Sequence, residues 1–152
     1  MTAPKAQGSC LCGEVRFTAA GAPLITMACH CTCCQRMTGS AYSLSSLYPS
    51  DAFEVTAGEP VLGGLRGAHR QYFCPACKSW LFTRPHGLDA YVNVRPTLLD
   101  DAPSYRPFIE VFASEALPWA RTGAPRSYER NPEEADFPAL LAAFAERGSG
   151  AT

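Results

Sequence analysis

Seven of the eight cysteines in this chain fall into three clusters with the spacing of metal ligands. The clusters are a CxC pair, a second CxC pair with a further cysteine three residues on, and a CxxC pair: Cys10 and Cys12; Cys29, Cys31 and Cys34; Cys74 and Cys77. Zn²⁺ takes four ligands in a tetrahedron, and a tight CxC or CxxC turn directs two sulfurs at one ion. The first and last clusters are therefore predicted to close a four-cysteine zinc site.

The middle cluster is predicted to hold a second zinc ion with fewer protein ligands. Cys29, Cys31 and Cys34 supply only three thiolates, and three ligands leave a position for water or substrate, as in catalytic zinc sites. Two alternatives stay open at this stage. His30 can complete the ligand set and close the site, or Cys33 can replace Cys34 as the third ligand instead of being a free thiol.

Two other uses of the cysteines compete with zinc: a disulfide framework, and a redox-active thiol cluster within residues 29–34. Residues 1–9 contain one lysine and no apolar run, so no signal peptide is expected and the protein is predicted to be cytoplasmic. In that reducing compartment, cysteines indicate metal ligands before disulfides. The longest apolar stretch, 139–145, is too short to cross a bilayer, so no membrane partner is expected.

Charge argues against a nucleic-acid partner. The formal net charge is −1, and no two lysines or arginines are adjacent. Seven thiolates with two Zn²⁺ ions would bring the total to about −4. A phosphate backbone requires a basic face, which this composition does not favour.

Composition predicts one mostly β domain spanning residues 1–152. Thirteen prolines and twelve glycines among 152 residues favour turns over long helices. Residues 1–7 are predicted to be a loose leader and 96–107 a loop. Short strands are expected at the alternating or apolar segments 14–19, 24–28, 42–48, 53–56, 69–73, 79–83, 90–95 and 108–113.

The only helix expected lies in a C-terminal tail, residues 131–148. Pro132 and Pro138 suit helix starts, and Gly148 suits an end. Its apolar face, Leu140, Leu141 and Phe144, can cover a core or mediate a contact between two copies, so a homodimer is considered. Both tryptophans, Trp80 and Trp119, are expected in the core.

The cysteine motifs and the residues around them resemble the glutathione-dependent formaldehyde-activating enzyme family, which includes the centromere protein V group. Three segments carry the resemblance: Gly8-Ser9-Cys10-x-Cys12-Gly13-x-Val15-Arg16-Phe17, Cys29-His30-Cys31-x-x-Cys34-x-Arg36-x-x-Gly39 and Phe73-Cys74-x-x-Cys77-x-x-Trp80-Leu81-Phe82. Two later segments look like the C-terminal half of the family: Leu98-Leu99-Asp100-Asp101 and Leu117-Pro118-Trp119. The resemblance extends over about residues 8–130.

This resemblance implies an Mss4-like β-tent of short antiparallel sheets stapled by zinc. It implies a structural zinc on the four-cysteine set and a catalytic zinc on Cys29, Cys31 and Cys34. The implied activity is that of a carbon–sulfur lyase, joining a thiol such as glutathione to formaldehyde. Three positions depart from the family pattern, namely Cys33, Lys78 where glycine is common, and Glu110 where many relatives have histidine.

Candidate supporting residues follow from this hypothesis. His30 is a candidate proton carrier beside the second zinc, and Arg36 and Arg95 are candidate clamps for a substrate carboxylate. Two rival functions are kept: a non-catalytic zinc module that binds a protein, and a thiol redox sensor that uses Cys33 and Cys34.

Overall fold

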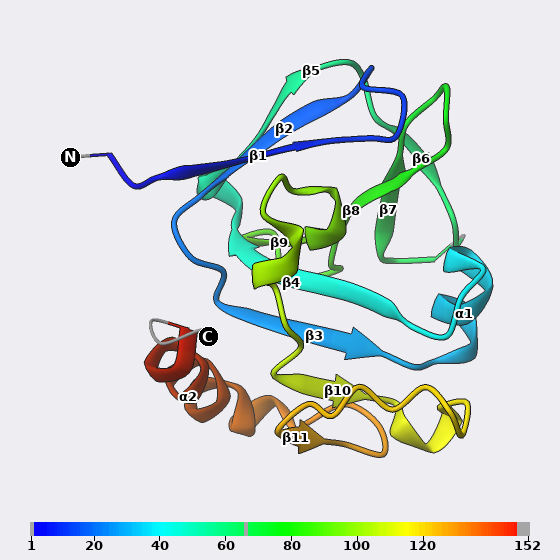
Figure 1. Cartoon of the computed structure of the whole chain (residues 1–152), viewed down its shortest axis with the longest axis vertical. Helices are drawn as coiled ribbons and strands as arrows, with labels where there is room; N and C mark the ends of the chain where they lie inside the picture. Colours follow the sequence, from blue (N-terminus) through cyan, green and yellow to red (C-terminus); the bar gives the residue numbers. More distant parts are fainter. Residues whose placement is uncertain (1, 66, 149–152) are drawn as a thin grey trace.

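Two β-sheets and two α-helices make up the fold of residues 2–65 and 67–148, the part that this computed structural model describes (Figure 1). The small sheet has the order β1-β2-β5, with β1 at Lys5–Ser9, β2 at Arg16–Ala20 and β5 at Phe53–Ala57. The large sheet has the order β11-β10-β3-β4-β9-β8-β7-β6. Its strands are β3 (Ile25–Cys29), β4 (Ser43–Pro49), β6 (Val61–Gly63), β7 (Arg70–Phe73), β8 (Trp80–Arg84), β9 (Tyr91–Val94), β10 (Ile109–Val111) and β11 (Arg126–Ser127). The predicted mostly β class is confirmed.

The N-terminal segment departs from the prediction of a loose leader. Lys5–Ser9 is strand β1 and pairs antiparallel with β2, so that Gly8 lies opposite Phe17. A Cβ at Gly8 would clash with the Phe17 ring, so the glycine permits this close approach. The segment shows no apolar alternation of its own, and its pairing depends on a partner strand that the local pattern cannot reveal.

The large sheet is mostly antiparallel, with parallel pairing at one end. β10 runs parallel to both β3 and β11, while β3 pairs antiparallel with β4. Strands β6 and β11 were not predicted, since they are only three and two residues long and consist of exposed residues. The predicted loop at 96–107 contains two short 3₁₀ turns, Pro96–Leu98 and Ala102–Ser104.

Helix α1 (Thr32–Thr38) was not predicted, because its first turn lies inside the cysteine cluster. Its N-cap is Cys31, whose sulfur accepts a hydrogen bond from the backbone N–H of Cys34. Cysteine is not a usual cap, so the sequence carried no ordinary start signal. The helix ends at Gly39, which adopts the left-handed conformation with φ 61°.

Helix α2 (Phe137–Gly148) lies where the sequence predicted a helix, beside β3, β10 and β11 in Figure 1. Leu140 is 1% exposed and belongs to a small core with Ile25, Phe108, Ile109 and Val111. The helix therefore covers a core within the chain. No helix in residues 2–65 and 67–148 combines the length and apolar character needed to span a bilayer.

The main core lies between the small sheet and strands β4, β8 and β9 of the large one. It includes Phe17, Tyr48, Phe53 and Phe82 together with Cys10 and Cys74. Trp80 is only partly buried and is not part of this core, and Trp119 is 77% exposed, so the predicted place of both tryptophans in the core is wrong. Trp119 lies in the irregular segment between β10 and β11.

Candidate metal centres

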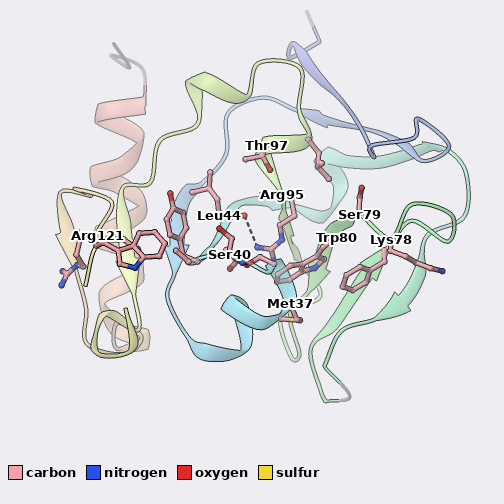
Figure 2. Close-up of a pocket in the computed structure, with 17 residues that line it drawn as sticks. Met37, Ser40, Leu44, Lys78, Ser79, Trp80, Arg95, Thr97 and Arg121 are labelled. Atoms are coloured by element: carbon pink, nitrogen blue, oxygen red, sulfur yellow. Dashed lines mark hydrogen bonds between the residues drawn. The ribbon is translucent and has the colours of Figure 1, made fainter. Parts of the chain in front are cut away.

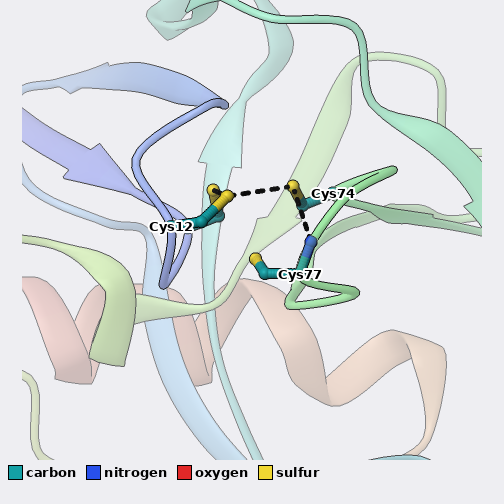
Figure 3. A group of neighbouring side chains, drawn as sticks. Cys12, Cys74 and Cys77 are labelled. Atoms are coloured by element: carbon teal, nitrogen blue, oxygen red, sulfur yellow. Dashed lines mark hydrogen bonds between the residues drawn. The ribbon is translucent and has the colours of Figure 1, made fainter.

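The first and last cysteine clusters meet in space although more than sixty residues separate them. The sulfurs of Cys10, Cys12, Cys74 and Cys77 all lie within 4.8 Å of one another. Cys12 Sγ lies 3.5 Å from Cys10 Sγ and 3.8 Å from Cys74 Sγ (Figure 3). Four sulfurs around one zinc at about 2.3 Å are separated by about 3.8 Å, so the donor set and its spacing fit Zn²⁺.

Backbone amides and one hydroxyl hold these sulfurs in place. Cys10 Sγ accepts from the Val15 N–H at 3.3 Å, and Cys74 Sγ accepts from the Cys77 N–H at 3.5 Å. The Ser79 hydroxyl connects the two turns, because it accepts from the Leu11 N–H at 3.2 Å and lies 3.2 Å from Cys77 Sγ. Its hydrogen bond is the main cause that lowers the pKa of the Cys77 thiol to about 5. Cys77 is thus ready to present a thiolate to a metal, whereas the hydrogen bonds shared with the other cysteines raise the pKa of Cys12.

The second group lies where β3 runs into α1. The sulfurs of Cys29, Cys31 and Cys34 also lie within 4.8 Å of one another. In the described part of the chain, no fourth histidine, cysteine or carboxylate extends this group. Cys33 is exposed and belongs to neither group, so the alternative in which it replaces Cys34 is not supported. All eight cysteines are described, and none forms a disulfide.

The second group also favours thiolate chemistry. A hydrogen bond from Cys29 is the main cause that lowers the pKa of Cys34 to about 5, against the opposing effect of burial. The Ser43 hydroxyl and the positive charge of Arg95 act in the same direction as the Cys29 bond. The shared hydrogen bond raises the pKa of Cys29 correspondingly. Three soft sulfur donors, one of them readily ionised, fit Zn²⁺.

His30 lies between two of these cysteines in the sequence, but its ring contacts Glu110 and not the cysteine group. The side chain is fully buried, and Nε2 lies 3.0 Å from Glu110 Oε2. Nδ1 is buried and has no hydrogen-bond partner. Because His30 is not part of the metal-binding group, the alternative in which it closes the site is not supported.

Glu110 is the centre of a buried polar network. It is 2% exposed and also accepts hydrogen bonds from Arg121 Nε at 2.7 Å and from the Thr122 hydroxyl at 2.9 Å. Burial alone would raise the pKa of Glu110, but hydrogen bonds from His30, Thr122 and Arg121 bring it down to about 2. The carboxylate is therefore charged at neutral pH. The sequence marked Glu110 only as a departure from a family pattern and gave no sign of its partners.

A pocket of about 880 Å³ lies beside the second cysteine group (Figure 2). Ser43 lines this pocket and lies opposite Cys29 in the pairing of β3 with β4, so the two are contiguous. The lining contains three cationic side chains, Lys78, Arg95 and Arg121, and no aspartate or glutamate. Of the two predicted carboxylate clamps, Arg95 is in the pocket, whereas Arg36 is exposed on α1 and does not line it.

Arg95 forms part of the pocket wall between β4 and β8. Its guanidinium carbon lies 3.5 Å from the centroid of the Trp80 ring. Nη1 donates to the Leu44 carbonyl at 3.0 Å, and Nη2 donates to the Thr83 hydroxyl at 3.1 Å. Burial lowers the pKa of Arg95 to about 10, and the side chain stays charged at neutral pH.

Comparison with known proteins identifies the family. The model of the glutathione-dependent formaldehyde-activating enzyme family matches residues 5–115. This chain belongs to that family. No curated protein matches the chain. One solved structure, the crystal structure of a Rhodobacter sphaeroides protein, is 17% identical, with a TM-score of 0.47; the match covers 62% of this chain and 88% of that chain. The family match includes both cysteine groups, which agrees with their capacity to bind metal.

Proposed function

We propose that this protein is a zinc-dependent enzyme of the carbon–sulfur lyase type that joins a thiol such as glutathione to a small aldehyde. The observation that carries the proposal is the three-cysteine group, which lacks a fourth ligand in the described chain and adjoins a pocket. Family membership supports the same reaction class. The four-cysteine group would hold a structural zinc, so the chain would carry two ions.

The two cysteine groups are assigned different roles, one structural and one catalytic, because their surroundings differ. Cys10 and Cys74 belong to the main core, where a four-ligand metal ties the β1–β2 turn to the β7–β8 turn. Cys29 and Cys31 are only partly buried and lie at the end of a strand. A site with an available position requires such access, because the substrate sulfur must reach it.

When bound by Cys29, Cys31 and Cys34, Zn²⁺ supplies a Lewis acid that favours the thiolate form of a thiol. The protein residues hold this group in place. Gln35 Nε2 donates to the His30 carbonyl at 2.8 Å, and the Cys34 N–H donates to Cys31 Sγ at 3.3 Å. His30 would have to accept the proton at Nδ1, the ring nitrogen without a partner, although its side chain is fully buried and does not line the pocket.

The pocket is matched to a substrate that carries negative charge. Glutathione bears two carboxylates, and the lining has cationic groups without acidic ones. A cytoplasmic location suits the proposal, since eight unpaired cysteines and a thiol substrate both need a reducing environment.

The test is a rate measurement with zinc-loaded protein, a thiol and formaldehyde, in which NMR follows the hydroxymethyl thioether. The reaction adds S–H across the C=O bond, so that one C–S and one O–H bond form and no oxidant is consumed. The wild type is expected to exceed the spontaneous rate, and Cys31→Ser is expected to stay folded and lose the acceleration. Cys33→Ser is the matched control and keeps it. The proposal fails when several thiols, glutathione among them, react no faster with protein than without.

A further inference from the structure

Arg95 is a buried cation without a carboxylate partner. The residue is 8% exposed, and none of the ion pairs among residues 2–65 and 67–148 includes it. Its two terminal nitrogens are held by a carbonyl and a hydroxyl, both neutral groups. Buried charges are normally paired, because desolvation of an isolated ion costs more than neutral hydrogen bonds return. The opposite charges that act on Arg95 are the thiolates of Cys34 and Cys29, and the Nε–H of its guanidinium has no acceptor.

Two hydrogen-bond donors at the same place have no acceptor. Nε of Arg95 and Nε1 of Trp80 are both buried and without a partner. The two side chains stack, and both line the pocket beside the second cysteine group. Unsatisfied buried donors are rare in native proteins, and each one requires an explanation such as a missing ligand. An anion bound at this wall of the pocket would offer acceptors to these two groups.

The other cations of the pocket are placed differently. Arg121 is already paired with Glu110, at 2.7 Å. Lys78 is exposed, and its ammonium group donates to the Pro75 carbonyl. Figure 2 shows Lys78 and Arg121 on opposite sides of the pocket, with Arg95 and Trp80 between them. Arg95 is thus the cation that combines burial, a fixed orientation and a free donor.

We propose that Arg95 and Trp80 form a subsite for a carboxylate group of the substrate thiol. The inference rests on the proposed function and specifies its substrate class as acidic thiols. Planar guanidinium groups bind carboxylates through directed N–H hydrogen bonds, and the indole N–H of Trp80 would be a further donor. The sulfur end of the same molecule would reach Cys29, Cys31 and Cys34 past Ser43, which lines the pocket and lies opposite Cys29 in the sheet. Because both nitrogens are buried in the free chain, binding would require neighbouring side chains to move.

Calorimetry with S-methylglutathione tests the subsite apart from the chemistry, since this probe has both carboxylates but no reactive thiol. The comparison ligand is its dimethyl ester, which lacks the negative charges. Wild-type protein is expected to bind the acid at least about tenfold more tightly than the ester, the range expected for a charged hydrogen bond. Trp80→Phe keeps the aromatic ring for stacking and removes the N–H, and Arg95→Lys keeps the charge and removes Nε. Each substitution is expected to weaken acid binding about tenfold and to leave ester binding unchanged.

Arg36→Met is the matched control, because it removes an equal charge from an exposed position outside the pocket. It is expected to bind both ligands like the wild type. If Arg95→Lys does not fold, judged by circular dichroism, Trp80→Phe decides the question. The subsite is overturned if the wild type does not bind the acid at millimolar concentration, if it binds the ester equally well, or if Trp80→Phe binds the acid unchanged.

The catalytic assay separates this inference from the proposed function. Equal acceleration for glutathione and its dimethyl ester would overturn the subsite and leave the enzyme activity standing. Selective binding of S-methylglutathione without acceleration for any thiol would support a carboxylate site and contradict the proposed reaction. Tryptophan fluorescence of the Trp119→Phe variant reports on Trp80 alone, and its emission is expected to change on binding the acid but not the ester.

Discussion

His30 Nε2 donates a hydrogen bond to Glu110 Oε2 at 3.0 Å, and neither residue is more than 2% exposed. The bond connects the segment that carries Cys29 and Cys31 to strand β10, eighty residues further along the chain. Through Arg121 and Thr122 the same carboxylate also fixes the segment that lines one side of the pocket. One buried acid thus supports both the second cysteine group and the pocket wall.

The first prediction is that Glu110→Gln destabilises the protein by about 2 kcal/mol, because each hydrogen bond to a charged group contributes about 1.5–3 kcal/mol and a neutral amide replaces the charged acceptor. Urea unfolding measures the change. Glu59→Gln removes an exposed carboxylate and serves as the control, with an expected effect within about 0.5 kcal/mol. Equal stability of the two variants would contradict a structural role for the network.

The second prediction concerns the pH dependence of the same carboxylate. The pKa of Glu110 is about 2 in the folded chain against an ordinary value of 4.5, so its contribution is fully present above pH 4.5. That contribution is lost as the pH falls toward 2, because the unfolded chain then binds the proton first. The stability difference between wild type and Glu110→Gln should shrink over this window. A difference that stays constant from pH 7 to pH 3 would show that the charge is not the cause.

The third prediction concerns Lys78, which has φ 63° in the turn after Cys77. A side chain in the left-handed region costs about 1–2 kcal/mol, and glycine avoids that cost. Lys78→Gly is expected to be about 1 kcal/mol more stable than Lys78→Ala, which retains the strain and serves as the matched control. Thermal unfolding of the zinc-loaded variants measures the difference. An alanine variant as stable as the glycine variant would show that the turn carries no strain at this position.

Local spacing predicted the cysteine groups because CxC and CxxC turns place their own sulfurs together, whatever the rest of the chain does. The alternating segments likewise predicted most strands, since a half-buried strand needs every second side chain to be apolar. Helix α1 was not predicted because its N-cap is Cys31, which is not a usual capping residue, and because the cysteines of this segment were interpreted as metal ligands.

The parts that could not be predicted depend on contacts between distant segments. Nothing near Glu110 in the sequence shows that His30 is its partner. Arg36 and Arg95 were equivalent candidates until the topology placed only Arg95 in the pocket. Trp119 was expected in the core because tryptophan usually is, but it lies in an irregular segment and is exposed.

The fourth prediction is an unequal response of the two cysteine groups to substitution. Cys74 is fully buried in the main core, and a structural zinc site contributes on the order of 10 kcal/mol to folding. Cys74→Ser is therefore expected to unfold the chain, whereas Cys31→Ser is expected to keep the fold and lose one ion. Circular dichroism with zinc analysis measures both. Equal unfolding by the two substitutions would favour two structural zinc ions and a non-catalytic module.

The most direct test of the central claim, one closed and one open zinc site, is the zinc content per chain before and after a mild chelator. We expect two ions in the purified protein and one after treatment, with the fold unchanged. The ion that is lost should be absent from Cys31→Ser from the start and should return when Zn²⁺ is added to the wild type. Two ions that both resist the chelator would contradict an open site at Cys29, Cys31 and Cys34.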